Sequence, residues 1–376
     1  MKTRFVLSID GGGVRGLVAA VFLDVLEGEV RKAGYQGPLS DCFDVIAGTS
    51  TGAIIAAGLA APARDTDGAA RGERTGGASG AGTIAKTTRT RPLLSPSQLR
   101  DLYRRKSRRI FPARALPFIP VLGAVRQLFG PLYSPKPLAR ILDDMFEDRD
   151  FINPRRNLLI TAYSLDPRDV VFFRGGPHTP PGDPLCTGTI RLADAVLGAA
   201  SAPTFFPPHV VINRRTGRRR TMIDGAVFIN DPAVAGFAEA LRLFPDDDVR
   251  VVSIGTGRIV EPISFETARR WGFFGWINPG GRIRTPLLST IFDGQARAVH
   301  SHMTKLLGDR YQRFDYDLAR GYGAPVIDDS SPANIRALET GALKMAEDMR
   351  PQLASLGRLL AENRARRDAQ QAPPPA

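Results

Sequence analysis

Three short motifs hold the side chains of this sequence that could take part in chemistry. Residues 10–16 read DGGGVRG, residues 48–52 read GTSTG, and residues 224–226 read DGA. The G-x-S-x-G pattern around Ser50, flanked by Gly48 and Gly52, is typical of a serine nucleophile presented on a sharp strand-to-helix turn, and it predicts a hydrolase. A carboxylate followed by two small residues, as in Asp224, Gly225 and Ala226, can approach such a serine closely, although Asp-Gly turns are also common in loops.

The glycine-rich motif predicts an anion site. Glycines at the start of a helix leave backbone N–H groups unobstructed, and these can bind a phosphate or the oxyanion of a tetrahedral intermediate. Gly11, Gly13 and Gly16 also match G-x-G-x-x-G, a dinucleotide fingerprint that many unrelated sequences contain. A P-loop is excluded, because no Gly-Lys-Ser/Thr follows.

The segments around the motifs indicate how they are positioned. Short apolar runs at 5–9 and 43–47 read as buried strands, each followed by an apolar helical pattern, at 14–30 and 53–59. The first two motifs therefore lie where a strand passes into a helix, and Asp224 follows a third strand at 221–223. Alternating strands and helices predict an α/β fold with a mostly parallel sheet.

Taken together and in this order, the motifs resemble those of the patatin-like phospholipase family. The family pattern is D-G-G-G-x-R-G, then G-x-S-x-G, then D-G-G/A, and further similarity lies in residues 44–52, 200–208 and 253–257. The resemblance covers about residues 3–330 and implies a three-layer α/β/α sandwich. The sequence departs from the family in an insertion at 63–92 and in having Ala226 where glycine is commoner.

The resemblance implies a Ser-Asp dyad in which Ser50 is the nucleophile and Asp224 accepts its proton. It assigns the oxyanion hole to the 11–13 loop, chiefly the N–H groups of Gly12 and Gly13 in addition to Gly11, with Arg15 holding the loop. No metal and no cofactor are implied. A carboxylate is a weak base at neutral pH unless burial raises its pKa, and such a pair protonates an amine leaving group poorly, so we expect esters as substrates. The implied activity is a lipid acyl hydrolase of the phospholipase A type, acting in lipid catabolism or membrane lipid degradation.

Three alternatives remain open at this stage. A Ser-Asp-His triad could use His300 or His302, but these side chains point in different directions on a helix, and a single strand precedes the Ser50 strand. A nucleotide-binding module would use the glycine loop but leaves Ser50 and Asp224 unexplained. Regulation by a cyclic dinucleotide, as in bacterial antiphage effectors of this family, is the third, although no motif identifies a nucleotide pocket.

The charge distribution favours an anionic partner. The chain has 51 Lys and Arg against 38 Asp and Glu, a net charge of +13, and residues 62–115 hold 13 basic and four acidic residues. Such a field suits an anionic membrane surface or a nucleic acid, while a solvated surface explains it equally well. Nucleic acid is the weaker reading, because the basic stretch offers only Tyr103 and Phe111 for base stacking. Two apolar aromatic segments, 111–133 and 271–277, suit either an interfacial lipid mouth or ordinary burial.

The remaining features set the domain organisation. We expect one catalytic domain over 3–330 with a flexible insertion at 63–92, a C-terminal helical region at 331–361 and a disordered tail at 362–376. No run of 18 apolar residues is present, and the first residues meet charge and glycine too soon for a secretory signal. Cys42 and Cys186 are too few for a disulfide framework. These features predict a cytoplasmic protein, with peripheral contact at the inner membrane surface as an alternative, and they predict no oligomeric state.

Overall fold

The computed structural model describes residues 1–63, 91–112, 130–151, 153–179, 189–258, 262–277, 286–318, 323–324 and 326–371. Within these residues the strands form one eight-stranded sheet. The strands are β1 (Thr3–Ile9), β2 (Val45–Thr49), β3 (Asn157–Ser164), β4 (Asp169–Gly175), β5 (His209–Ile212), β6 (Arg219–Asp224), β7 (Asp248–Ile254) and β8 (Tyr311–Phe314).

The centre of the sheet is parallel and one side of it is antiparallel. The strand order is β5-β6-β3-β2-β1-β7-β8, and β4 also pairs with β3. The pairs β1–β2, β2–β3, β1–β7 and β7–β8 are parallel, whereas β4 and β6 run antiparallel to β3. The predicted α/β fold with a mostly parallel sheet is therefore confirmed, and β5 and β6 form an antiparallel hairpin joined by residues 213–218.

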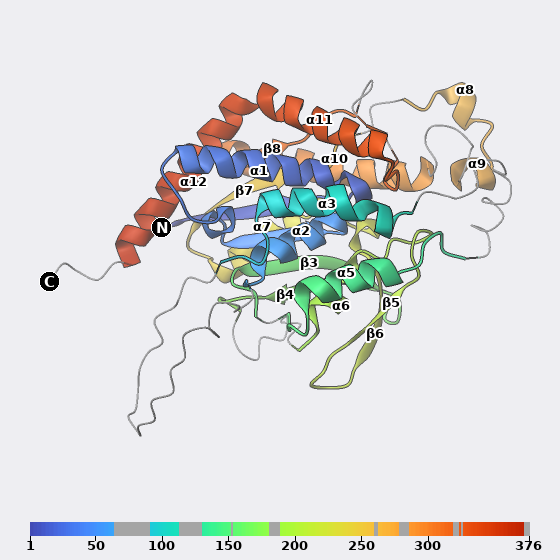
Figure 1. The fold of residues 1–376 in the computed structure, drawn as a ribbon, viewed down its shortest axis with the longest axis horizontal. Helices are drawn as coiled ribbons and strands as arrows, with labels where there is room; N and C mark the ends of the chain where they lie inside the picture. The colour runs from blue at the N-terminus through green and yellow to red at the C-terminus, as the bar shows by residue number, and fades with distance from the viewer. Residues whose placement is uncertain are drawn as a thin grey trace.

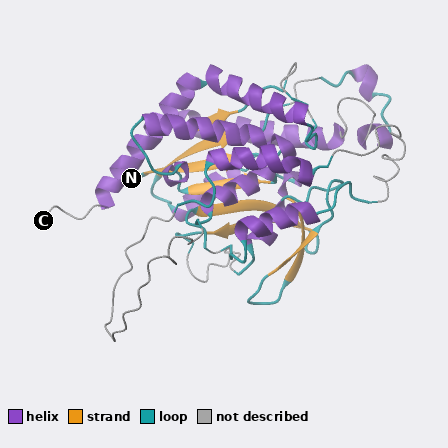
Figure 2. Ribbon diagram, viewed as in Figure 1, coloured by secondary structure: helices purple, strands orange, loops and turns teal. Residues whose placement is uncertain are grey.

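Helices cover both faces of this sheet, because the buried strands are apolar on both sides (Figures 1 and 2). Along β1, Phe5, Leu7 and Ile9 belong to the larger core, and Val6 points into a separate core on the opposite face. The larger core is covered by α1 (Gly16–Lys32), α2 (Thr51–Ala60), α3 (Pro96–Ile110), α5 (Lys136–Phe146), α6 (Leu192–Ala199), α11 (Pro332–Asp348) and α12 (Arg350–Gln371). The second core is covered by α7 (Ala233–Leu243) and α10 (Pro286–Leu307).

The C-terminal helices differ from the sequence-based expectation. The predicted disordered tail from residue 362 is wrong over residues 362–371, since α12 continues to Gln371. Polar residues stay helical there because they bind the body of the protein: Arg367 pairs with Asp44 at 2.8 Å, and Arg364 donates to the Asp41 carbonyl at 3.4 Å. Residues 372–376 lie outside the described residues.

The predicted insertion also lies almost wholly outside the described residues, but its two ends do not. Pro62 and Pro92 form an isolated antiparallel bridge, and the Ala63 N–H donates to the Arg91 carbonyl at 2.7 Å. The two ends of the insertion are therefore held next to each other.

Two further helices lie at one end of the molecule. These are α8 (Phe265–Ala268) and α9 (Phe273–Ile277), which Figure 1 shows beyond the helical layers, near α10. Among the described residues, no helix combines the length and the apolar character that crossing a bilayer requires.

Candidate active site

Ser50 sits on a strained turn between β2 and α2. Its backbone has φ 54° and ψ −122°, a left-handed conformation that costs energy for a residue with a Cβ. The turn closes tightly over β1, because a Cβ at Gly52 would collide with the Ile9 carbonyl. Tyr103 of α3 fixes the first turn of α2 through hydrogen bonds to the hydroxyl and the carbonyl of Thr51. The serine hydroxyl is therefore held at the carboxyl end of β2, at the start of a helix.

The strand pairing brings Asp224 to the same place. β4 runs along one edge of β3, so β2 and β6 share the other edge. On that edge Thr49 pairs with Thr161, and Asp224 pairs with the next residue, Ala162. Because Ser50 directly follows Thr49, the end of β6 meets the nucleophile turn, although the two residues are far apart in sequence.

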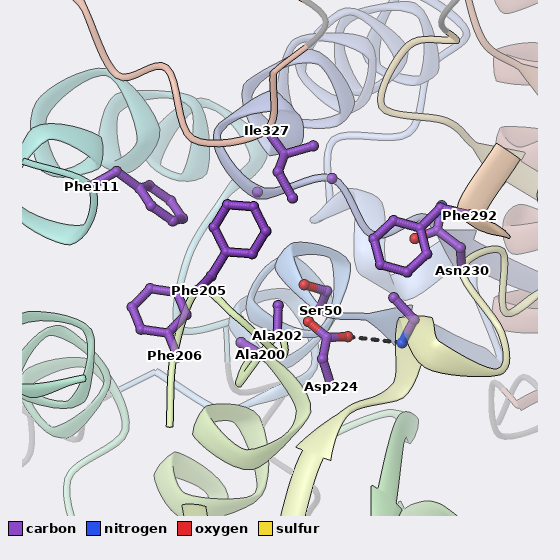
Figure 3. A pocket seen from close by; sticks show the side chains of 13 residues that line it. Ser50, Phe111, Ala200, Ala202, Phe205, Phe206, Asp224, Asn230, Phe292 and Ile327 are labelled. Carbon is purple, nitrogen blue, oxygen red and sulfur yellow. Dashed lines mark hydrogen bonds between the residues drawn. The ribbon is translucent and has the colours of Figure 1, made fainter. Parts of the chain in front are cut away.

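The Asp224 carboxyl is buried and faces Ser50 (Figure 3). Its Oδ1 accepts a hydrogen bond from the Ala226 N–H at 2.9 Å, whereas Oδ2 is buried without a hydrogen-bond partner among the described residues. Burial raises the pKa of Asp224 to about 7, although the nearby Ser50 hydroxyl and the Ala226 N–H each lower it. A carboxyl with this pKa can accept a proton near neutral pH.

Two N–H groups of the glycine-rich loop are free to bind an anion. The Gly11 N–H donates to the Asn230 carbonyl at 3.1 Å and the Val14 N–H donates to the Ile327 carbonyl at 2.8 Å. Within the described part of the chain, the intervening N–H groups of Gly12 and Gly13 have no acceptor. Gly13 has φ 58°, and a Cβ there would collide with the Ile327 carbonyl, so this loop conformation depends on glycine.

The predicted anion-site residues therefore fall into two groups. Gly12 and Gly13 line the same pocket as Ser50 and Asp224. Gly11 and Arg15 are not among the lining residues; the Gly11 N–H is already used, and the buried Arg15 guanidinium donates to the Gly257 carbonyl at 3.1 Å. Arg15 thus ties the glycine loop to the turn after β7, and it is not among the residues that line the pocket.

A buried arginine that the sequence analysis did not identify forms ion pairs with the start of the glycine-rich loop and with two neighbouring loops. Arg313 on β8 pairs with three carboxylates: Asp10 at 2.7 Å, Asp231 at 2.8 Å and Asp315 at 2.9 Å. Burial disfavours its charge, but these carboxylates outweigh burial and keep the pKa of Arg313 well above its usual value. A lone arginine on a four-residue strand carries no motif, so no sequence signal pointed to it.

Each of these carboxylates belongs to a different loop of the site. Asp10 begins the glycine loop, Asp231 follows Asn230, and Asp315 accepts the Gly257 N–H at 3.0 Å. Arg313 is therefore the common charge partner of the loops that surround the free N–H groups.

None of the four histidines, all of them in the described residues, lines the pocket. His300 faces Tyr311 at 3.4 Å, His209 faces Asp194 at 3.3 Å, and His178 contacts Asn157 and Phe244. The exposed His302 lies on α10. This arrangement offers no imidazole to Ser50.

The rest of the pocket is apolar. Its volume is about 420 Å³ with its open mouth included, and its larger side chains are Phe111, Phe205, Phe206, Phe292 and Ile327 (Figure 3). Phe111 packs against Phe206 with ring centroids 5.7 Å apart. Such a wall suits a hydrocarbon chain beside the reacting carbonyl. Phe111 faces this pocket and Tyr103 is buried, so neither ring offers a stacking platform for nucleic acid.

Comparison with known proteins places the chain in a family. The model of the family described as patatin-like phospholipase matches residues 7–236. Patatin-like protein 1 of Arabidopsis thaliana is 28% identical over 90% of this chain and 80% of its own length. Patatin-2-Kuras 1 of Solanum tuberosum is 26% identical over 89% of this chain and 83% of its own. The cGAMP-activated phospholipase of Vibrio cholerae is 27% identical over 91% of this chain and 90% of its own. The chain therefore belongs to the patatin-like phospholipase family, and it is a hydrolase of lipid acyl esters.

Proposed function

We propose that this enzyme cleaves acyl esters of membrane lipids with a Ser50–Asp224 dyad and an oxyanion hole formed by the N–H groups of Gly12 and Gly13. One observation carries the proposal: an apolar pocket contains a strained serine, a buried carboxyl with a pKa of about 7 and two free N–H groups.

In the first half of the reaction, Ser50 Oγ attacks the ester carbonyl and its proton passes to the Asp224 carboxylate. The carbonyl oxygen becomes an oxyanion, which the Gly12 and Gly13 N–H groups stabilise. The intermediate then collapses, the bond to the alcohol oxygen breaks, and the departing alkoxide takes the proton from Asp224. Water repeats these steps on the acyl-Ser50 ester, which releases the fatty acid and restores the serine.

The leaving group makes esters better substrates than amides in this scheme. The bond to an alkoxide breaks far more readily than the bond to an amide nitrogen, because an amine anion is a much stronger base than an alkoxide. An alkoxide is far more basic than a carboxylate and takes the proton readily. The aromatic wall accepts the acyl chain, which supports lipid esters over short polar ones.

The test combines active-site labelling with turnover. A fluorophosphonate probe should label the wild-type enzyme. It should label Asp224→Asn much more weakly or not at all, and it should not label Ser50→Ala. Hydrolysis of p-nitrophenyl butyrate and of phosphatidylglycerol should fall by several orders of magnitude in both variants. His300→Ala is the matched control and should keep its activity. Loss of activity in His300→Ala with retention in Asp224→Asn would assign the role of base to His300 instead and overturn the dyad.

Regulation by a cyclic dinucleotide rests on one observation, the similarity to the cGAMP-activated phospholipase over most of both chains. We propose the direct test, in which lipid hydrolysis is measured with and without cGAMP. A large increase in turnover on addition supports the regulation, and equal rates exclude cGAMP as the activator.

A further inference from the structure

An exposed aromatic surface lies at the end of the molecule that carries α8 and α9. Phe265 is 76% exposed, Phe273 is 70% exposed and Phe274 is 66% exposed. The half-buried Trp271 and Trp276 pack edge to face beside them, with ring centroids 5.2 Å apart. Large apolar side chains gathered within 12 consecutive positions, three of them mostly exposed, indicate a contact surface.

This surface is continuous with the mouth of the Ser50 pocket through α10. The helix α9 packs against α10, whose Leu287 and Ile291 are exposed. The next residue of α10, Phe292, lines the pocket. Apolar side chains therefore extend from the solvent-facing rings of α9 to the wall of the reaction site.

Positive charge borders the pocket on its other side. The helix α3 ends at Ile110, and the next residue, Phe111, lines the pocket. The exposed Arg108 and Arg109 lie in its last turn, and within the described part of the chain neither has an acidic partner. Earlier on the same helix, by contrast, Arg100 and Arg104 pair with Glu339.

We propose that α8, α9, the first half of α10 and the last turn of α3 form a docking surface for an anionic lipid bilayer. The exposed rings enter the interfacial region, and Arg108 and Arg109 attract the anionic headgroups. This inference rests on the proposed function, because docking in this orientation places the open mouth of the lipid ester site against the bilayer. The charge balance supports a bilayer as the occupant: in α8, α9 and their junction, Arg269 pairs with Glu266, the single acidic residue there, and Arg270 leaves the segment with a net positive charge.

The chain carries its own probe for this proposal. Its only two tryptophans, Trp271 and Trp276, lie within the surface. Ser50→Ala is used throughout the binding measurements, so that the lipid is not consumed. With vesicles of 30% phosphatidylglycerol in phosphatidylcholine, tryptophan emission should shift to the blue, and lipids brominated on the acyl chain should quench it. Emission that is neither shifted nor quenched while the protein co-sediments with the vesicles overturns the proposed surface.

Two sets of variants separate the apolar and the electrostatic contributions. Phe273→Ser/Phe274→Ser should weaken vesicle binding by about 100-fold, since each exposed ring loses its transfer into the interface. Leu306→Ser is the matched control, because Leu306 is 62% exposed but lies at the opposite end of α10; it should bind as the parent does. Arg108→Glu/Arg109→Glu should weaken binding to phosphatidylglycerol vesicles and reduce its salt dependence, and should leave binding to pure phosphatidylcholine unchanged.

The outcomes also distinguish this proposal from the proposed function. With Ser50 restored, all these variants should hydrolyse p-nitrophenyl butyrate at the parental rate, because none of the substituted residues lines the pocket. Normal vesicle binding by Phe273→Ser/Phe274→Ser overturns the docking surface and leaves the dyad untouched. Retained turnover in Ser50→Ala overturns the dyad whatever the vesicles show. Concentration-dependent dimerisation that Phe273→Ser/Phe274→Ser abolishes, with no loss of vesicle binding, would assign the surface to a second copy of the chain.

Discussion

Replacement of Asp224 by asparagine should stabilise the fold, and the gain should depend on pH. The buried carboxyl keeps its proton in the folded state up to about pH 7, whereas in the unfolded chain it ionises near its ordinary value of 3.8. Between these values the unfolded state loses a proton that the folded state retains, so the free energy of unfolding falls as pH rises. Asparagine cannot ionise, so the free energy of unfolding of the variant does not fall in this way.

The size of the effect follows from the pKa difference. A shift of about 3 units corresponds to about 4 kcal/mol at pH 7 and above, and to almost nothing at pH 4. For a chain of this length, about 4 kcal/mol corresponds to about 5 °C in Tm. An asparagine amide placed at the unpartnered Oδ2 position adds its own cost, but that cost does not change with pH. The pH dependence of the difference between variant and wild type is therefore the quantity to measure.

Thermal unfolding of Asp224→Asn and wild type between pH 4.5 and 8.5 provides the test, with Asp41→Asn as the control. Burial alone would raise the pKa of Asp41, but Arg156 and Arg155 outweigh it and lower that pKa. Asp41→Asn should therefore be less stable than wild type, and its deficit should stay nearly constant from pH 8.5 to 4.5, because a lowered pKa places the loss of this stability below the ordinary value of 3.8. A Tm difference for Asp224→Asn that stays constant over this range, or that moves toward destabilisation as pH rises, would show that the folded enzyme does not hold Asp224 protonated.

Three further predictions concern activity and stability. Turnover of p-nitrophenyl butyrate should reach a plateau above about pH 7 and fall about tenfold per pH unit below it, since Asp224 must be ionised to take the Ser50 proton. A flat profile from pH 5 to 8 would contradict this role. Arg313→Ala should lose about 3–5 kcal/mol of stability in urea unfolding, because three buried carboxylates lose their partner. Arg313→Lys keeps the charge but not the forked geometry, so it should be more stable than Arg313→Ala and still show a reduced kcat. A wild-type kcat in the lysine variant would argue against a positioning role. Replacing residues 64–90 by a short Gly-Ser linker should leave Tm and ester turnover near wild type, because the Pro62–Pro92 bridge already holds the ends together; loss of both would show that the insertion is needed for the fold.

Sequence reasoning located the parts of the site that are local in the chain. Strand, glycine turn and helix follow one another around residues 10–16 and around Ser50, so composition and periodicity were enough to place both turns. The approach of Asp224 to Ser50 was expected from the family resemblance alone, because it depends on two strands sharing one edge of β3, and nothing in either motif encodes that pairing.

What the sequence did not predict depends on contacts between distant segments. The strand β8 has only four residues, and their polar and apolar side chains form no clear pattern. It is a strand because it pairs with β7. Its Arg313 acquires its role only when three separate loops converge on it. The polar end of α12 was expected to be disordered because its residues offer no apolar face, and ion pairs to Asp44 supply the missing interaction.

The position of Arg313 in the chain also sets when its ion pairs with the loops of the site can form during synthesis. Arg313 follows Asp10 by 303 residues, and at translation rates of roughly 5–20 residues per second it emerges about 15–60 s later. Until then, the carboxyl groups of Asp10 and Asp231 lack the guanidinium that pairs with both of them in the folded protein. The ion pairs that join the loops of the reaction site can therefore form only after most of the chain has been synthesised, long after Ser50 has left the ribosome.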